Sequence, residues 1–198
     1  MLELYDLPLS LNCYKVRLML AFLGVPYARK TVNLLEGAHK TAEFLAINPF
    51  GQIPVLVDGE QVLRDSQAII VWLARRHSAG TWMPDDADAE ALVNAWLAAA
   101  AYEIRLGPYD ARLAALYPAL CVNEATAVER SHTALALYEG RLREREWIAL
   151  DRPTVADVAA FPAISQSGDG GIGLEPYPAV RAWLERLRAL PGFVRLVD

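Results

Sequence analysis

Two neighbouring stretches carry the strongest structural signal in this chain: NPFGQIPVLVDG at residues 48–59 and LRDSQAII at residues 63–70. Pro54 stands directly before an apolar run typical of a strand, where a proline has no N–H to give to a neighbouring strand. We expect a turn with a cis Ile53–Pro54 bond, which would face the Ile53 backbone outward to pair with an extended ligand. Asp58-Gly59 then predicts a tight hairpin between two short strands.

The helix expected after this hairpin begins with several ligand-binding groups. Asp65-Ser66 opens it, so a carboxylate, a hydroxyl and unpaired backbone N–H groups should lie at one point. The N–H groups and the Ser66 hydroxyl suit a carboxylate, whereas Asp65 suits an ammonium group. Together they fit the α-amino-acid end of a ligand.

Composition limits the classes of protein to consider. The 198 residues are 54% hydrophobic and 22% charged, which is typical of one ample domain or two small ones. A net charge of −5 argues against nucleic-acid binding, which needs a basic surface. The amino-terminal residues do not resemble a signal peptide, and the alanine-rich run at 96–101 is too short to span a membrane. Cys13 and Cys121 form neither a disulfide framework nor a metal motif, so we expect a cytoplasmic protein without a metal or a membrane partner.

Residues 1–79 are expected to alternate strands and helices before the all-helical remainder begins. The order βαβαββα, with a proline before the third strand, is that of a thioredoxin-like fold, whose four strands and flanking helices can bury a core in few residues. Apolar periodicity predicts strands at 1–5 and 28–34 and helices at 14–24 and 38–47, ahead of the hairpin and the helix from residue 65.

A polar segment at residues 84–88, PDDAD, ends the alternating pattern. From residue 85 to residue 198 the chain is expected to be all helical, because its apolar residues recur at helical spacing. Leu92, Trp96 and Ala99 should lie on one face of the first long, amphipathic helix. Candidate long helices lie at 88–115, 123–145 and 176–190.

The chain resembles the glutathione transferase family over almost its whole length. The motifs are individually weak, but they occur in the family's order and at its distances. The resemblance implies a thioredoxin-like domain at residues 1–79 that binds glutathione, and an all-helical domain at residues 85–198 that forms the pocket for an acceptor substrate. The motifs lie at residues 15–17, 24–27, 37–40, 52–54, 65–66, 154–157 (spaced as a helix capping box) and 177–183.

The reaction implied by this resemblance needs the thiolate of glutathione, yet a free thiol with a pKa of ~8.5 is only a few per cent ionised at neutral pH. The family places a hydrogen-bond donor for the sulfur between the first strand and the first helix. Counting back from Lys15, Ser10 falls on the position of the family's catalytic serine or cysteine, and Asn12 falls on its asparagine. Each could instead only cap the helix; we expect Ser10 to be the main donor and Asn12 a secondary one.

Cys13 completes a Ser-x-x-Cys segment that matches a redox Cys-x-x-Cys motif with serine in the nucleophilic position. We therefore expect Cys13 to be a packing residue, while a mixed-disulfide role stays open. Cys121 is also expected to be a packing residue.

The remaining glutathione contacts come from the resemblance as well. The pair His39 and Lys40, which could equally be ordinary solvated residues, would meet the glycine carboxylate. The γ-glutamyl end would lie at the start of the helix from residue 65. The implied glutathione-binding residues are His39, Lys40, Gln52, Ile53, Pro54, Asp65 and Ser66.

The acceptor pocket is expected on the first long helix, with Tyr102, Arg105 and Tyr109 as candidates or, equally, as core and surface residues. We predict a homodimeric glutathione transferase that conjugates glutathione, its co-substrate, to small hydrophobic electrophiles. Phe50 could enter the partner subunit or pack in its own chain. The alternatives are a glutathione-dependent disulfide reductase or isomerase, and a non-catalytic glutathione-binding scaffold.

Overall fold

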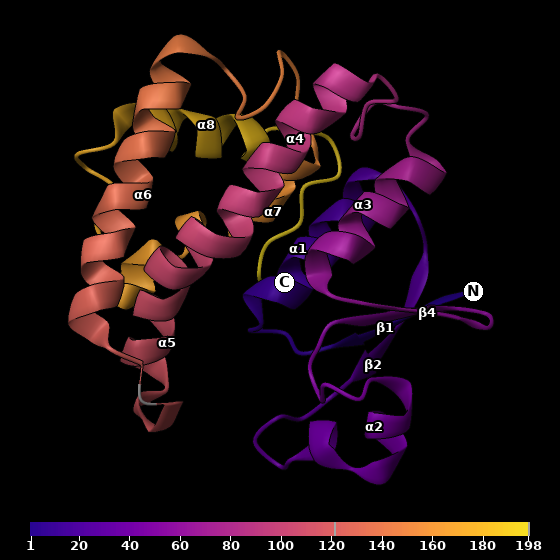
Figure 1. The fold of residues 1–198 in the computed structure, drawn as a ribbon. Helices are drawn as coiled ribbons and strands as arrows, with labels where there is room; N and C mark the ends of the chain where they lie inside the picture. The colour runs from indigo at the N-terminus through magenta and orange to yellow at the C-terminus, as the bar shows by residue number, and fades with distance from the viewer. Residues whose placement is uncertain (121, 198) are drawn as a thin grey trace. The chain divides into compact units, whose positions relative to one another are not determined.

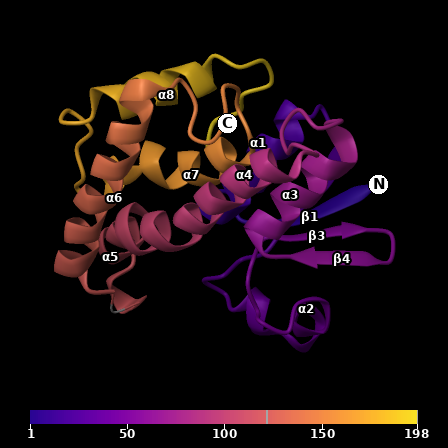
Figure 2. The same cartoon turned by 45° about the horizontal axis from the view of Figure 1, so that its top comes forward.

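A computed structural model describes residues 1–120 and 122–197. The chain divides into two compact units, one containing residues 1–79 and the tail from residue 191, the other containing residues 80–190. Figure 1 and Figure 2 show the elements of each unit. No helix among the described residues is long and apolar enough to cross a membrane.

The first unit has the expected βαβαββα order around a mixed four-stranded sheet of strand order β2-β1-β3-β4. Strands β1 and β2 are parallel, and the other neighbours are antiparallel. The strands are β1 (Leu2–Asp6), β2 (Tyr27–Thr31), β3 (Val55–Asp58) and β4 (Gln61–Arg64). The helices are α1 (Leu11–Phe22), the short 3-10 turn η1 (Ala38–Lys40), α2 (Ala42–Ile47) and α3 (Ser66–His77).

Helices cover both faces of this sheet, with α1 and α3 on one side and α2 on the other (Figures 1 and 2). Successive side chains of a strand point to opposite faces of the sheet, so alternate residues contact the helices on each side. Leu4 and Leu56 are paired across β1 and β3 and are fully buried. On the α2 side, Phe44 packs with Val55, and its ring meets the edge of Tyr5 at 5.9 Å between centroids. The two apolar faces explain how so short a segment buries a core.

The carboxyl-terminal tail belongs to the first unit, whereas the sequence placed it in the helical half. The Tyr14 hydroxyl donates to the Val194 carbonyl at 2.8 Å, and the Arg17 guanidinium donates to the Leu196 carbonyl at 2.9 Å. Gly192 has φ +85°, and a side chain there would lie 2.7 Å from a backbone oxygen of α1. These tertiary contacts cannot be inferred from the tail's own composition.

The second unit is helical throughout. Its central helix, α7, buries every residue from Val155 to Ile164 and lies among α4, α6 and α8 (Figure 2). The elements are α4 (Ala87–Ala99), the π-helix η2 (Ala100–Tyr109), α5 (Asp110–Leu116), the 3-10 turn η3 (Pro118–Leu120), α6 (Glu124–Glu144), α7 (Val155–Ser165), the 3-10 turn η4 (Ser167–Gly170) and α8 (Pro178–Arg188).

The single helix expected at 88–115 is wrong, because the segment is divided into α4, η2 and α5. Gly107 has non-helical angles of φ −100° and ψ −105° and precedes Pro108, which has no N–H to donate. A side chain at Gly107 would lie 3.0 Å from the backbone of Ser131 in α6, so the two helices approach closely here.

The buried face of α4 is not centred on the apolar face expected from Leu92, Trp96 and Ala99. Leu92 is 52% exposed, while Val93 and Leu97 are buried, followed by Ala100 and Ile104 in η2. This offset lies within α4 itself, before η2 begins at Ala100.

The capping box expected at residues 154–157 is confirmed at the start of α7. Asp157 is fully buried and accepts hydrogen bonds from the Thr154 N–H at 2.9 Å, the Ile148 N–H at 3.0 Å and the Trp183 indole at 2.9 Å. One carboxylate therefore joins the loop before α7, its first turn and α8. Burial raises the pKa of Asp157 despite these donors.

Candidate functional site

A cavity of about 80 Å³ lies in the first unit, where the loop before β3, the end of β4 and the amino-terminal turns of α1 and α3 meet. Six of the residues proposed from sequence line it, together with two that were not. The lining residues are Asn12, Asn48, Gln52, Ile53, Pro54, Arg64, Asp65 and Ser66. The cavity is therefore lined mainly by polar side chains and the Ile53–Pro54 turn.

The loop at one wall is fixed by Asn48, which is 2% exposed. Its amide donates to the Gln52 carbonyl at 2.7 Å, and its side-chain oxygen accepts from the Phe50 N–H at 3.2 Å. The bond that follows, Ile53–Pro54, is cis as expected. Asn48 thus sets the path of the backbone that forms the cavity wall.

The opposite wall is the amino terminus of α3. Asp65 caps this helix, and its Oδ1 accepts from the backbone N–H groups of Gln67 at 2.9 Å and Ala68 at 3.1 Å. The backbone of Asp65 has φ +70°, which is uncommon for a non-glycine residue and costs of order 1–3 kcal/mol. Such strain is concentrated at functional sites. The helix terminus itself favours a negatively charged group.

Three side chains form a hydrogen-bonded cluster between α1 and α3. The Lys15 ammonium donates to the Ser66 hydroxyl oxygen at 3.1 Å, and that hydroxyl lies 3.5 Å from Oδ1 of Asn12. Lys15 is only 6% exposed. Burial lowers the pKa of Lys15 to about 8, although the Asp65 carboxylate opposes this change.

Ser10 caps α1, and its hydroxyl oxygen accepts from the Cys13 N–H at 3.3 Å. Capping uses the oxygen as an acceptor and leaves the hydroxyl proton for another acceptor. Ser10 is not among the residues that line the cavity, whereas Asn12 is. Both interpretations of Ser10, as a cap and as a donor, are compatible with this geometry.

Cys13 is fully buried, which matches the expected packing role. Burial is the main reason why the pKa of its thiol is raised to about 12. The thiol is thus protonated at neutral pH, which disfavours nucleophilic attack. Cys121 lies outside the described residues.

His39 and Lys40 lie in η1 and do not line the cavity. They pack beside its loop, since a side chain at Gly51 would be 2.9 Å from the His39 carbonyl and 2.9 Å from the Lys40 ammonium. The Nδ1 atom of His39 is buried and has no hydrogen-bond partner among the described residues. Lys40 is exposed.

The three candidate acceptor-site residues lie on η2 in the second unit. The Arg105 guanidinium lies over the Tyr109 ring at 4.5 Å and forms an ion pair with Asp110. Tyr102 is 63% exposed. Arg105 and Tyr109 therefore form a pair, and Tyr102 presents its ring to solvent.

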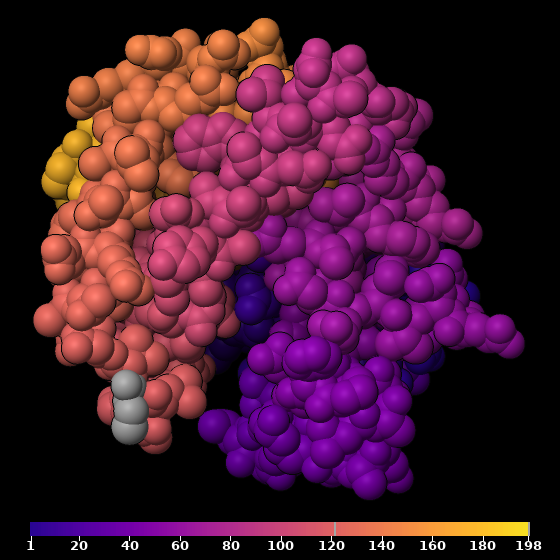
Figure 3. Space-filling model, in the orientation of Figure 1, coloured from indigo at the N-terminus to yellow at the C-terminus, as the bar shows by residue number. Residues whose placement is uncertain are grey.

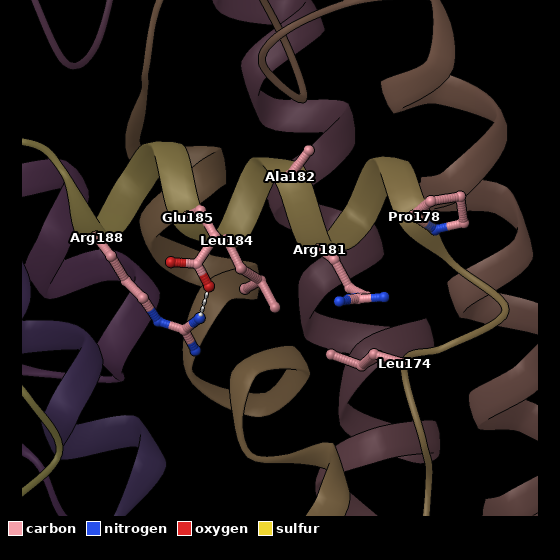
Figure 4. A pocket seen from close by; sticks show the side chains of 7 residues that line it. All are labelled: Leu174, Pro178, Arg181, Ala182, Leu184, Glu185 and Arg188. Carbon is pink, nitrogen blue, oxygen red and sulfur yellow. Dashed lines mark hydrogen bonds and ion pairs between the residues drawn. The ribbon is translucent and has the colours of Figure 1, made fainter.

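A larger hollow of about 440 Å³ lies along α8 in the second unit (Figure 4). Arg188 and Glu185 form an ion pair at 2.6 Å beside it, and Arg181 points from the same helix. Its charged side chains are exposed, and none of the candidate residues contributes to it. We assign it no chemistry.

Sequence reasoning missed Asn48, Arg64 and the role of Lys15. The first two flank recognised motifs, since Asn48 opens the first quoted stretch and Arg64 precedes Asp65. Lys15 was recognised only as part of a motif. Its position in a helix did not indicate that the side chain is buried and reaches α3.

Comparisons with known proteins agree over both units. The family model for the glutathione S-transferase N-terminal domain matches residues 9–76, and the model for the C-terminal domain matches residues 122–191. Glutathione S-transferase 3 of Zea mays is 34% identical over 211 residues, covering 99% of this chain and 93% of that protein. Glutathione S-transferase theta-2 of Rattus norvegicus is 34% identical over 201 residues, covering 96% of this chain and 82% of that protein.

Solved structures are similar along the whole chain. A glutathione S-transferase from Pseudomonas fluorescens has a TM-score of 0.92 at 30% identity, covering 100% of this chain and 99% of that one. A glutathione transferase homolog from Drosophila mojavensis, solved with bound glutathione, has a TM-score of 0.88 at 25% identity and covers 96% of this chain and 88% of that one.

Proposed function

We propose that this protein conjugates the glutathione thiolate to small hydrophobic electrophiles. The chain belongs to the glutathione S-transferase family and is a glutathione transferase. The observation that carries the proposal is the polar cavity between the Ile53–Pro54 turn and the start of α3. This arrangement offers an extended backbone for a peptide next to donors for a carboxylate.

The γ-glutamyl end of glutathione fits the wall formed by α3. Its carboxylate would accept from the Ser66 hydroxyl and from backbone N–H groups of the first turn. Oδ1 of Asp65 accepts both capping hydrogen bonds, so Oδ2 is left for the ligand's ammonium group. Replacing Ser66 by Ala together with Asp65→Asn should weaken binding of glutathione, measured by calorimetry. Unchanged affinity would remove this assignment.

The cysteinyl and glycyl parts would follow the loop. We propose that the Ile53 backbone pairs with the cysteinyl residue and that Gln52 supports the glycyl end. The Lys40 charge and the unpartnered Nδ1 of His39 support a carboxylate near η1. The ligand would thus be held at both ends, with its thiol in between.

We propose that Ser10 is the main donor to the sulfur and that Asn12 is a secondary donor. The position of Ser10 at the start of α1 supports this, as does the position of Asn12 on the cavity wall. Lowering the thiol pKa by two units corresponds to roughly 2.7 kcal/mol of preferential thiolate stabilisation. Ser10→Ala should reduce turnover at neutral pH roughly ten- to a thousandfold. An unchanged rate, with activity abolished in Asn12→Ala instead, would reverse the two roles.

The acceptor is proposed to contact Tyr102, Arg105 and Tyr109 on η2. The π-helical geometry supports this, because such segments frequently occur at functional sites. Tyr109→Ala should raise the KM for the acceptor and leave the KM for glutathione unchanged. An equal change in both constants would argue for a structural role.

We also propose that the protein acts in the cytoplasm as a homodimer. Phe50 lies beneath the Arg64 guanidinium of its own chain and is still 57% exposed, and this exposure supports a contact with a partner. Leu92 of α4 is 52% exposed and Leu137 of α6 is 59% exposed. Figure 3 shows the surface of the molecule from the side of Figure 1. Sedimentation should give a dimer at micromolar concentration, and Phe50→Ala should weaken it. A wild-type monomer would refute the dimer, and an undiminished Phe50→Ala dimer would refute the contact.

Conjugation is preferred to disulfide reduction because Cys13 is buried and protonated. Rates with an aryl halide, a mixed disulfide of glutathione and an isomerisable diketone would separate conjugation, reduction and isomerisation. We expect the aryl halide to be the best substrate and Cys13→Ser to leave its rate nearly intact. Activity with none of the three, together with retained glutathione binding, would indicate a scaffold.

A further inference from the structure

Lys15 is a buried cation that the proposed function does not use. It is 6% exposed in the second turn of α1, and the structure gives it no ion pair within the described residues. Its ammonium donates to the neutral Ser66 hydroxyl at 3.1 Å. Lysine is almost never buried without a partner, because removing the charge from water is costly.

The Lys15 ammonium is hydrogen-bonded to a neutral hydroxyl rather than to a carboxylate. Asp65 of α3 is the carboxylate that acts on Lys15 electrostatically, and its Oδ1 is occupied by two backbone N–H groups. Asn12 and Ser66, which complete the cluster, are neutral. A ligand carboxylate bound by Ser66 would place a negative charge beside the Lys15 ammonium.

We propose that Lys15 is a positioning residue that orients the Ser66 hydroxyl and supplies the positive charge beneath the bound γ-glutamyl carboxylate. This inference rests on the proposed function, since it needs that carboxylate at Ser66. Because the ammonium donates to the Ser66 oxygen, the hydroxyl proton must point elsewhere. It points towards Asn12, 3.5 Å away, and would turn to a carboxylate that enters the cavity. Polarisation by the ammonium makes the hydroxyl a stronger donor.

Proton uptake is a second consequence of this geometry. In the free protein the pKa of Lys15 is about 8, so near that pH about half of the molecules lack the proton. A carboxylate placed above the ammonium favours the charged form and raises that pKa. Binding near pH 8 should therefore take up a fraction of a proton, and the contribution of Lys15 to affinity should fall as the pH rises further.

The first test measures binding by calorimetry at pH 7 with S-methylglutathione, whose sulfur cannot ionise. The second ligand is its analogue with γ-aminobutyrate in place of γ-glutamate, which lacks only the α-carboxylate. Lys15→Met should weaken binding of S-methylglutathione roughly ten- to a hundredfold, the range expected for a hydrogen-bond network to a charged group. Affinity for the analogue should be the same in both proteins. The exposed lysine of β2 provides the matched control, Lys30→Met.

The outcomes separate this inference from the proposed function. If the wild-type protein does not bind S-methylglutathione, both are refuted. If it binds and Lys15→Met binds equally well, only the role of Lys15 is refuted. An equal loss for both ligands would indicate that Lys15 is merely structural, which also overturns the inference.

A second measurement uses the wild-type protein alone and so does not depend on how the variant folds. Binding enthalpies at pH 8 in two buffers of different ionisation enthalpy give the number of protons taken up. Uptake should be greater for S-methylglutathione than for the analogue, because only the former places a carboxylate by Lys15. Equal uptake would overturn the inference.

Discussion

Asp157→Ala should destabilise the helical unit strongly, because its carboxylate accepts four buried hydrogen bonds, one of them from the Thr154 hydroxyl. The N–H groups of Thr154 and Ile148 and the indole of Trp183 would all lose their acceptor. Leaving a buried donor unpaired costs about 1–3 kcal/mol, and Asp157→Ala leaves several buried donors unpaired at once. We expect a loss of about 4 kcal/mol, a large part of the ~5–15 kcal/mol that stabilises a typical domain.

The loss can be measured by urea unfolding followed by circular dichroism. Asp157→Asn keeps the shape and one acceptor oxygen, so it should cost less than Asp157→Ala. Asp151→Ala is the matched control, because the side chain of Asp151 is 94% exposed and pairs with Arg145 at the surface. Its effect should stay below about 1 kcal/mol. Equal unfolding midpoints for Asp157→Ala and Asp151→Ala would refute this account of the capping box.

Three further predictions concern other parts of the chain. Because the pKa of Lys15 is lowered in the folded protein, the unfolded chain binds more protons between about pH 8 and 10.5. The stability of the wild-type protein should therefore rise with pH relative to Lys15→Met over that range, by at most about 3 kcal/mol, and parallel stability curves would contradict this. Gly51→Ala should weaken glutathione binding, because Gly51 has φ +59° and the new methyl group would lie 2.9 Å from the His39 carbonyl. Titration calorimetry would measure the change, and an affinity equal to that of the wild-type protein would contradict the prediction. Gly107→Ala should lower the melting temperature, because the new methyl group would lie 3.0 Å from the Ser131 backbone. Gly140→Ala, at an uncrowded position, should not lower it. Equal melting temperatures of the two variants would contradict the close contact between η2 and α6.

The first unit was predictable from sequence because its signals are local. Pro54, Asp58-Gly59 and Asp65 each mark a boundary within a few residues of where the structure has it. In the structure the turn of the hairpin falls on residues 59–60, because Asp58 still pairs with Gln61. Turn and cap preferences depend on neighbouring residues in the chain, so one sequence can reveal them.

The long helix of the second unit was not predictable in the same way. Its π-helical section and the bend at Gly107 depend on the close approach of α6, which involves residues far along the chain. Helical spacing grouped Leu92 with Trp96 and Ala99, whereas the structure buries Val93 and Leu97. The docking of the carboxyl-terminal tail is likewise a tertiary feature.

The candidate site also combines residues that local motifs predict with residues that only tertiary contacts place. Ile53, Pro54, Asp65 and Ser66 lie in recognisable local motifs, and the structure brings them to one cavity. Lys15 lies on a helix that is buried on nearly every side, so periodicity could not indicate which neighbour its ammonium reaches.

The most direct test of the proposed function is the pKa of the glutathione thiol when bound, obtained from the ultraviolet absorbance of the thiolate against pH. The account predicts that wild-type protein lowers this pKa by about two units from its free value of ~8.5, and that Ser10→Ala returns much of that change. A bound thiol that titrates at the free value in the wild-type protein would contradict the proposal that this cavity activates glutathione.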